Sequence, residues 1–507
     1  MDNDSIIIKR QEELDRRLDP RWQPETDTPV LGSLGGSTVY EMSDRTRAIS
    51  HGGIGLIQQL VKLIGLPEEI DKNLSLLKIK KPYHESDHIL NIVYNIISGG
   101  HCIEDIQLRR QDINYLDALG AHRIPHSTTA GDFLRRFDSS AVKKLLDALN
   151  EVRLGIWRNQ PEEKRQIAII DIDGTLTDTD GACKEGADFS YKGTFGYGPL
   201  VISLANTGEV LFIVNRSGNR PSHDGAPEWL DRTVSWARKA GFKKIRFRGD
   251  TDFSLTKHFD RWNDDGIEFA FGIDANRTFV SRADNLDESS FMPLERRQRD
   301  VSEPRARPFN YREAAVVARG YKNYRLQYEH VAEVEYTPTK SERTYRMVIL
   351  RKNISVEKGE ESLFDQIRYF FYVTNIGCSE MSAKAVVFEN NARCNQENLI
   401  EQLKNGVRAL KAPAVEFNAN WAYMVIGSLA WNLKSWLGLT LPDSLYPEFD
   451  PSEIIRMEFR GFIRRIIEIP AQIVRTGRRR IFRLLSCPQT VRIVLDGSAW
   501  LRQQLRV

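Results

Sequence analysis

The sequence predicts a protein of mixed α/β class, and three changes of pattern along its 507 residues support that prediction. Residues 50–155 repeat apolar side chains at the spacing of amphipathic helices. Residues 165–275 instead show short apolar runs bounded by turn residues, which indicate strands, with helical stretches between them. Residues 276–375 contain mainly strand-like runs. A chain of this length should form about two to four domains.

The composition is that of an ordinary globular protein, with 41% hydrophobic and 28% charged residues. The first residues are acidic and unlike a signal peptide, so we expect a cytoplasmic protein. The most apolar long stretch, residues 421–441, contains Asn432 and Lys434 and should be a buried helix rather than a membrane span. The cysteines are odd in number and lack CxxC spacing, which argues against a zinc site or a disulfide framework: Cys102, Cys183, Cys378, Cys394 and Cys487.

The N-terminal part is predicted to be a polar arm, residues 1–45, followed by an all-helical domain, residues 46–158. This domain carries two pairs of adjacent arginines on short helices joined by tight turns, namely Arg109, Arg110, Arg135 and Arg136. The pattern resembles a DNA-binding module of the helix-turn-helix type. Ordinary helical packing with solvated arginines is a comparable alternative.

The C-terminal region, residues 446–507, is strongly basic. From Arg456 onward it contains no lysine, and three acids stand against twelve arginines, at 456, 460, 464, 465, 475, 478, 479, 480, 483, 492, 502 and 506. Arginine binds phosphate in a bidentate manner that lysine cannot reproduce, so this region favours nucleic acid, with Arg478, Arg479 and Arg480 as the densest run. A solvated helical face would show a similar excess of charge.

Two apolar runs end in acidic residues. Ile167-Ala-Ile-Ile leads into Asp171 and Asp173, and a second run from residue 244 leads into Asp250. A carboxylate at the end of a buried strand is costly unless it binds a metal, a cation or a reacting phosphate. The two acidic strand ends therefore suggest an active site built on a sheet, although aspartate also commonly caps a helix or a turn.

The elements around these acids follow a recognisable order. Runs at 200–205 and 210–214 are separated by a hairpin signal, so the first three strands should form an antiparallel meander. A helix and further strands follow, which matches a ribonuclease H-like core. We place this core at residues 159–275 and 376–445, with residues 276–375 as an inserted β domain.

Such a core needs a third carboxylate on a later helix. Arg393, Glu397 and Lys404 are spaced by four and seven residues, so on one continuous helix they would share a face. One acid could then face a metal while two cations face a phosphate. The spacing is common on solvated helices, but it gains weight from its position after two strand-end acids.

These blocks together resemble the DDE transposases of bacterial insertion sequences, in the group with a Y-x2-R-x3-E-x6-K signature, and specifically insertion-sequence family 1380. The resemblance rests on Asp173-Gly-Thr, Tyr197-Gly-Pro-Leu, Arg216-Ser-Gly-Asn, Arg248-Gly-Asp-Thr-Asp-Phe and the segment from Arg393 to Lys404. It implies that Asp173, Asp250 and Glu397 are the catalytic acids. It also implies that they bind two Mg²⁺ ions, for which Mn²⁺ can substitute, while Arg393 and Lys404 bind DNA phosphate.

The chain departs from the family pattern at two points. Asn390 stands where the signature has its tyrosine. Some relatives trap a flipped base with a tryptophan in the β insertion, and residues 276–375 contain no tryptophan. Whether cleavage passes through a DNA hairpin therefore stays open.

The resemblance implies terminal inverted repeats and target DNA as partners, and a homodimer in the DNA complex because two ends must be cut. In a bacterial cell the protein would associate with the nucleoid when it is bound to DNA. We expect the helical domain to read the repeat and the C-terminal arginines to contact phosphate. Truncation before Arg456 should then flatten the salt dependence of DNA binding.

Two other functions fit parts of the sequence. Asp171-x-Asp173-Gly-Thr matches the first motif of haloacid-dehalogenase-like phosphatases, with Asp171 as nucleophile, Asp173 as acid/base and a lysine among residues 239, 243 and 244. The predicted antiparallel hairpin and the face at 393–404 speak against that function. A DNA-binding protein without catalysis is the other alternative, but all three acids are present. We expect His223 and Asp224 only to shape a loop.

Overall fold

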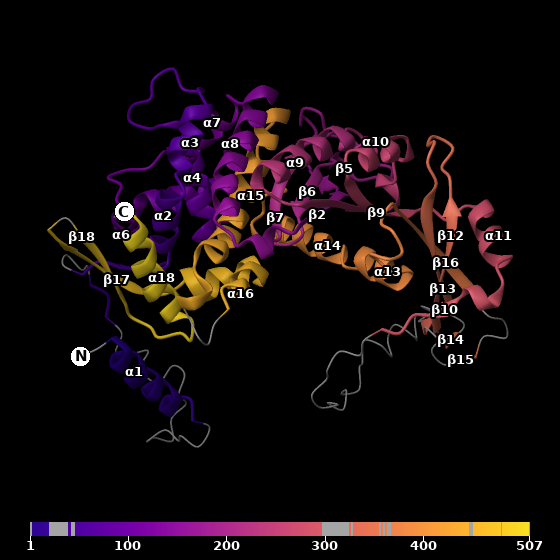
Figure 1. The fold of residues 1–507 in the computed structure, drawn as a ribbon. Coiled ribbons are helices and arrows are strands. Elements are labelled where there is room, and N and C mark those ends of the chain that lie inside the picture. The colour runs from indigo at the N-terminus through magenta and orange to yellow at the C-terminus, as the bar shows by residue number, and fades with distance from the viewer. Residues whose placement is uncertain are drawn as a thin grey trace. The chain divides into compact units, whose positions relative to one another are not determined.

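The computed structural model describes residues 3–19, 39–41, 46–296, 324–325, 328–353, 356–357, 360–361, 367–445, 450–477 and 479–505 (Figure 1). The chain forms two compact units, one from residues 1–156 and 402–507 and the other from residues 157–401. Residues 402–445 therefore belong to a different unit from the one in which the sequence analysis placed them. The remaining domain boundaries stay predictions.

The first unit is mainly helical, as its apolar periodicity indicates. Its helices are α1 (Asn3–Arg17), α2 (Ile54–Leu63), α3 (Leu66–Asn73), α4 (Glu85–Ile97), α5 (Ile106–Gln111), α6 (Ile113–Leu119), α7 (Ser127–Leu134), most of α8 (Ser139–Arg158), α15 (Phe417–Thr440), α16 (Ser452–Arg456), α17 (Phe459–Phe462) and α18 (Val491–Gln504). One apolar face of α2 is buried, and α4 and α15 pack against each other. Leucine and isoleucine from these helices form the core of the unit.

Helix α15 is buried along nearly its whole length, from Ala419 to Gly438, so the prediction of a buried helix is confirmed. Among the described residues, no helix is both long enough and apolar enough to span a membrane. Lys434 lies inside this core, where its ammonium donates to the carbonyl oxygens of Ile455 and Met457. Burial lowers the pKa of Lys434 to about 7.

A hairpin of β17 (Ala471–Thr476) and β18 (Arg479–Leu484) closes the first unit against β1 (Ala48–Ile49). The segment before it contributes buried Phe459, Phe462 and Ile466 to the core. Truncation before Arg456 would remove these side chains and expose their neighbours to water, so it would test folding rather than the salt dependence of DNA binding. Substitution of exposed arginines is the better test.

The second unit is built on a mixed sheet of nine strands in the order β10-β12-β13-β16-β9-β8-β2-β6-β7. These strands are β2 (Ile167–Gly174), β6 (Leu200–Leu204), β7 (Glu209–Val214), β8 (Lys244–Gly249), β9 (Ile267–Ile273), β10 (Met292–Pro293), β12 (Tyr328–Tyr336), β13 (Tyr345–Asn353) and β16 (Ile367–Thr374). Strands β2, β6 and β7 pair antiparallel, which confirms the predicted meander. Strand β8 lies parallel to β2 on one side and to β9 on the other.

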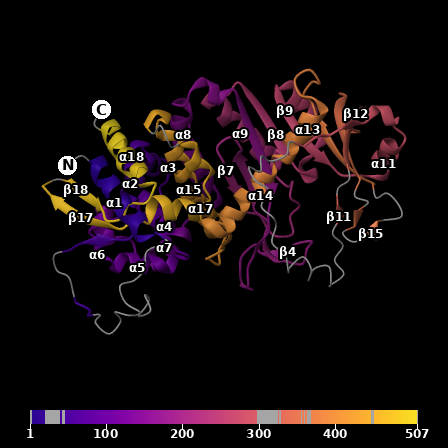
Figure 2. The ribbon, with the colours of Figure 1, turned by 90° about the horizontal axis from the view of Figure 1, so that it is seen from below.

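Helices cover both faces of this sheet (Figures 1 and 2). One face carries α9 (Ala226–Ala240) and α10 (Phe259–Asp264), and the other carries α13 (Ala383–Asn391) and α14 (Cys394–Glu401). Trp229, Trp262 and Phe247 belong to the buried residues of the α9 and α10 side. The acids that end the strands therefore have one helical layer on each side.

The segment at 276–375 begins with α11 (Arg277–Asp284), and its strands extend the same sheet. The strand-like runs predicted for this segment are confirmed where the structure describes it, as β12, β13 and β16. Phe371–Thr374 of β16 pair with Ala270–Ile273 of β9, so these strands continue the central sheet. A separate small sheet contains β11 (Tyr324–Arg325), β14 (Val356–Glu357) and β15 (Glu360–Glu361).

A small separate sheet of three strands, in the order β3-β5-β4, lies in the chain between β2 and β6. It consists of β3 (Thr177–Asp178), β4 (Asp188–Phe189) and β5 (Phe195–Tyr197). Gly196, with φ of 154°, lies so close to Thr177 that a Cβ atom would be 2.0 Å from its carbonyl oxygen. A side chain at Gly196 would therefore separate the two strands.

Candidate active site

Two predicted acids come together at one edge of the sheet. Asp173 lies near the end of β2, and Asp250 directly follows β8. The two strands are parallel, with Asp171 opposite Arg248, so the two acids stand two residues further along neighbouring strands. Because the carboxyl ends of parallel strands meet at the same edge, a shared site forms there.

Asp171 and Asp173 point to the same face of β2, because strand side chains repeat every second residue. Their environments differ sharply. Asp171 is 1% exposed and forms a bidentate pair with Arg248, with N–O distances of 2.7 and 2.8 Å. Asp173 is 14% exposed and lies 3.2 Å from the Arg393 guanidinium. The structure therefore assigns Asp171 to an internal ion pair and leaves Asp173 at the open strand end.

The two strand-end acids disfavour each other's charge. Burial, and then the charge of Asp250, raise the pKa of Asp173 from its usual 3.8 to about 7. Burial likewise raises the pKa of Asp250, whose carboxylate also accepts a hydrogen bond from the backbone amide of Asp252 at 3.0 Å. A cation at this edge would let both carboxyl groups ionise together.

The predicted third acid reaches the same site through Arg393. The guanidinium of Arg393 lies 3.2 Å from a carboxylate oxygen of Asp173 and 3.7 Å from one of Glu397. Glu397 lies in the first turn of α14 and is 62% exposed. One arginine thus bridges the strand that carries the first acid and the helix that carries the third.

The prediction of one helix from Arg393 to Lys404 is wrong in detail. Arg393 lies in the turn between α13 and α14, and Lys404 lies in a π-helical turn, Gln402–Gly406, after α14 ends. The break and the wider π turn change the rotation between these side chains, so the assumption of a shared helical face does not hold. Lys404 belongs to the other compact unit, and its role on DNA phosphate stays a prediction.

The carboxylates present are suitable donors for a hard divalent cation, because all offer oxygen. In the described part of the chain, no three His, Cys, Asp or Glu side chains lie close enough to hold a metal ion together. Arg393 instead contacts both Asp173 and Glu397. The donor set fits such a cation, and binding one would require Arg393 to give up these contacts.

Sequence reasoning missed several side chains that build the site. Gln396, next to Glu397, accepts a hydrogen bond from the Ser203 hydroxyl and donates one to the carbonyl oxygen of Val201, which fastens α14 to β6. Arg248 was recognised only as part of a motif. Its position opposite Asp171 on a neighbouring parallel strand was the available signal.

The structure shows the contacts of two sites whose roles the sequence left open, Asn390 and the loop at 223–224. Asn390 is buried and donates to the carbonyl oxygen of Val386 at 3.0 Å, so it does not present a polar group in place of the signature tyrosine. The loop that contains His223 and Asp224 is organised by buried Arg216, whose guanidinium donates to the carbonyl oxygens of Ser222 and Asp224 at 2.8 Å each. These contacts are consistent with a loop-shaping role.

The proposed DNA-binding arginines differ in how they face solvent. Arg109 donates to the Ser98 carbonyl oxygen and lies 5.8 Å from the centre of the Tyr115 ring, so its guanidinium is engaged within the helical unit. Arg110, Arg135 and Arg136 are exposed, as are Arg479 and Arg480 on β18, whereas Arg478 lies outside the described residues.

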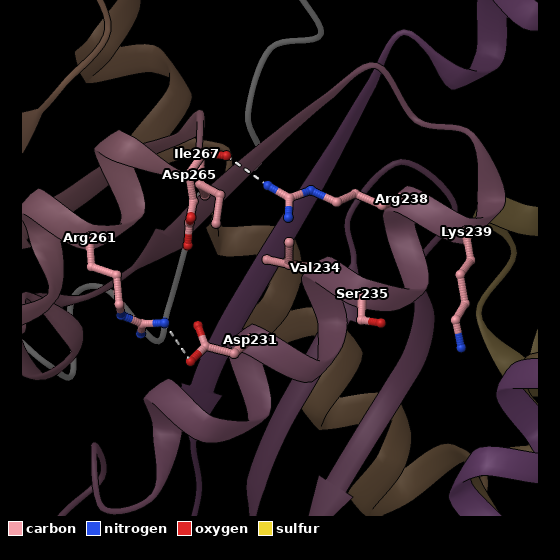
Figure 3. Close-up of a pocket in the computed structure, with 8 residues that line it drawn as sticks. All are labelled: Asp231, Val234, Ser235, Arg238, Lys239, Arg261, Asp265 and Ile267. Carbon is pink, nitrogen blue, oxygen red and sulfur yellow. Dashed lines mark hydrogen bonds and ion pairs between the residues drawn. The ribbon is translucent and has the colours of Figure 1, made fainter.

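A shallow hollow of about 360 Å³ lies on the side of the sheet covered by α9 and α10 (Figure 3). Arg261 pairs with Asp231 at 2.8 Å, and Arg238 donates to the carbonyl oxygen of Asp265 at 2.7 Å. None of the predicted catalytic acids is among its lining residues. The hollow is therefore separate from the candidate active site.

The phosphatase alternative does not fit this geometry. Its nucleophile would be Asp171, which is buried and doubly bonded to Arg248. Strand β6 runs antiparallel to β2, where a doubly wound sheet would place a parallel neighbour. Lys243 and Lys244 pair with Glu162 and Glu268. The local motif match therefore lacks the accessible nucleophile that the chemistry needs.

The raised pKa of Asp173 predicts a pH-dependent effect on stability. The pKa of Asp173 rises from its usual 3.8 to about 7 in the folded state, so between these pH values the folded protein binds a proton that the unfolded chain has lost. The contribution of Asp173 to stability is therefore present at low pH and is lost as the pH rises through 7. In the absence of divalent cations, we expect Asp173→Asn to be more stable than wild type at pH 8, by about 2–4 kcal/mol. Urea denaturation at pH 8 and pH 4.5 measures this. A gain that is equally large at pH 4.5 would contradict the explanation.

Two of three comparisons with known proteins found a match for this chain. Over residues 34–504 the chain matches a family model described as transposase DDE domain group 1. Among solved structures, the chain is similar to a piggyBac transposase in a synaptic complex with hairpin DNA, with 10% sequence identity and a TM-score of 0.39 over 83% of each chain. No curated protein sequence matches it. Because the family model covers nearly the whole sequence, the chain belongs to the DDE transposases.

Proposed function

We propose that this transposase binds the terminal inverted repeats of its own insertion sequence and catalyses divalent-metal-dependent cleavage and transfer of DNA strands. Asp173, Asp250 and Glu397 would be the catalytic carboxylates. The observation that carries the proposal is the meeting of Asp173 and Asp250 at adjacent strand ends, with Arg393 spanning from Asp173 to Glu397. The family membership supplies the reaction class.

The arrangement of the central strands supports a ribonuclease H-like core. Strands β7, β6, β2, β8 and β9 are neighbours in this order, with β6 antiparallel to β2 and with β2, β8 and β9 parallel. Asp173 lies on β2, which is the first of these five strands along the chain. Asp250 directly follows β8, which is the fourth. The third acid comes from a helix, α14, which contacts β2.

Asp173, Asp250 and Glu397 would hold two Mg²⁺ ions, and Mn²⁺ can substitute because it favours the same oxygen ligands. When bound, the ions would activate a water molecule or a 3′-hydroxyl and neutralise the leaving oxygen. The raised pKa of Asp173 means that the protein alone holds a proton there near neutral pH. Asp173 would therefore release this proton when a metal ion binds, so the Mg²⁺ concentration needed for half-maximal cleavage should rise as pH falls.

Arg393 would change partners during the reaction. Its guanidinium, which bridges Asp173 and Glu397, is the cation nearest to the acids among the contacts of the described residues. A phosphate next to the scissile bond would attract this planar group into bidentate contact. Lys404 would provide a second cation for the same strand of DNA.

The proposed partners are terminal inverted repeats and target DNA, within a homodimer in which each protomer cuts one end. We further propose membership of insertion-sequence family 1380 and a bacterial, nucleoid-associated location. The motif blocks from Asp173 to Lys404 support the family assignment. The arginine-rich C-terminal region supports DNA as the partner.

The C-terminal hairpin gives a direct prediction for DNA binding. Arg479 and Arg480 are exposed on β18, so replacing both with glutamine should weaken DNA binding and reduce the slope of log affinity against log salt by about 2. The slope is measured by fluorescence anisotropy at salt concentrations from about 50 to about 300 mM. Arg261→Gln, which changes an exposed arginine beside the hollow, serves as the control. A slope equal to that of wild type would remove this hairpin from the DNA interface.

The function itself is tested by incubating the wild-type protein and Mg²⁺ with a duplex that carries the element's own end. Cleavage at the end, and none with a scrambled duplex, is the expected result. A generic phosphomonoester is offered in parallel. Hydrolysis of the phosphomonoester without any DNA cleavage would favour the phosphatase alternative.

A further inference from the structure

The side chain of Arg248 is buried where three segments of the second unit meet. Its Nε and Nη2 atoms donate to the two carboxylate oxygens of Asp171 at 2.7 and 2.8 Å. Its Nη1 atom donates to the carbonyl oxygen of Glu389 at 3.2 Å and lies 3.4 Å from that residue's Oε1. All three nitrogen atoms of the guanidinium therefore have partners, on β2 and at the end of α13.

Two of these contacts lie directly beside the strand-end acids. Asp171 precedes Asp173 by two residues on β2, and Arg248 precedes Asp250 by two residues at the end of β8. Side chains two residues apart share one face of a strand, about 7 Å along its axis. The Asp171–Arg248 pair therefore fixes the spacing between the two strands one step behind Asp173 and Asp250.

The third contact fixes the helical side of the site. Glu389 lies in the last turn of α13, four residues before Arg393 and eight before Glu397. The carbonyl oxygens of a last helical turn lack partners within the helix, and Arg248 supplies a donor to one of them. The same guanidinium thus holds the helix end from which the chain turns into α14.

Only a guanidinium can make this set of contacts. Burial lowers the pKa of Arg248, but its hydrogen bonds to Asp171 and Glu389 raise it above its usual value, so the group stays charged. Burial raises the pKa of Asp171, and the two hydrogen bonds from Arg248 oppose that shift. A lysine would keep the charge but could not reach three acceptors in one plane.

We propose that Arg248 is a positioning residue for strand cleavage, which sets the relative placement of the three acids by tying β2, β8 and the end of α13 to one planar group. This inference rests on the proposed function. It predicts a defect in the chemical step rather than in DNA affinity, because misplacing groups that act together by about 1 Å can cost about 100-fold in rate.

Arg246 provides a matched control on the same face of the same strand. It is also buried, and it forms hydrogen bonds to Glu268 at 2.9 and 2.6 Å and an ion pair with Glu389 at 3.3 Å. It differs in lying two residues further from the end of β8, and the hydrogen bonds and ion pairs described for its side chain reach Glu268 and Glu389 but not β2. Its loss should disturb the fold to a similar degree without moving the acids.

The experiment compares Arg248→Lys and Arg246→Lys in the full-length protein. Single-turnover cleavage at saturating DNA, DNA affinity and urea denaturation are measured for each. We expect Arg248→Lys to cleave about 100-fold more slowly with DNA affinity near that of wild type. Arg246→Lys should stay within about threefold of wild type in rate. Equal rate losses in the two variants, or a near-normal rate for Arg248→Lys, would overturn the inference.

A second variant covers the case in which Arg248→Lys does not fold. The double variant Asp171→Leu/Arg248→Met replaces the buried pair with apolar groups, which commonly preserves stability. It should be folded and bind DNA while cleaving slowly, and normal cleavage by this folded variant would refute the positioning role. Failure of the wild type to cut its own end would instead refute the proposed function and would leave these variants without a rate to compare.

Discussion

Asp173→Asn is expected to reduce DNA strand cleavage by about 10³-fold or more, while the folded protein still binds the element's end. The asparagine keeps the shape of the side chain and removes the charge that would hold a divalent cation beside Asp250. It also removes the ion pair with Arg393, which lies 3.2 Å from Asp173 in the structure. The loss should therefore appear in the chemical step.

The measurement is Mg²⁺- or Mn²⁺-dependent cleavage of an end-containing duplex, with affinity determined separately in Ca²⁺. Asp264→Asn is the control, because Asp264 is an exposed acid that pairs with Arg343 away from the strand ends. This control should cleave like the wild type. Retention of cleavage by Asp173→Asn would show that the catalytic acids have been assigned incorrectly, even though the family membership would stand.

Asp171→Ala is expected to destabilise the protein by about 3–5 kcal/mol, because it leaves the buried Arg248 guanidinium without its bidentate partner. The side chain of Arg248 is 4% exposed and that of Asp171 is 1% exposed, so water cannot replace the lost carboxylate without opening the core. Urea denaturation followed by circular dichroism measures the change. A loss below about 1 kcal/mol would mean that the pair is solvated in solution.

This prediction changes how an Asp171 variant must be interpreted. From the sequence, loss of activity in Asp171→Ala would favour Asp171 as a phosphatase nucleophile. The structure predicts that the same substitution unfolds or loosens the second unit, so activity would fall for a structural reason. The double variant Asp171→Leu/Arg248→Met separates these explanations, because it should recover stability without recovering strand cleavage.

The sequence allowed the acids and the central meander to be predicted because both depend on local pattern. Alternating apolar strands with a hairpin signal define β6 and β7, and glycine follows Asp173 and precedes Asp250 at the strand ends. The pairing of Asp171 with Arg248 depends on the register between strands far apart in the chain, which local spacing does not contain. The sequence therefore left both aspartates of the first motif as candidates.

Around the third acid, Glu397, local spacing in the sequence predicted the wrong structure. Helical spacing predicted one continuous element from Arg393 to Lys404, but the chain turns at Ala392 and Arg393 and widens into a π turn at Gln402. Charge spacing carries no information on such breaks. Glu389 and Gln396, which fasten the two helices to the sheet, are polar residues that a helical pattern alone assigns to solvent.

The pairing of β16 with β9 means that residues 276–375 cannot behave as a detachable cassette. Removing this segment would leave Phe271, Gly272 and Ile273 of β9 as an open edge of backbone donors and acceptors, which is a template for aggregation. In the intact protein, amide protons of β13 and β16 should exchange with solvent together with those of β8 and β9, as one cooperative unit. Transplanting the segment between related transposases would carry a thermodynamic penalty for the catalytic strands as well.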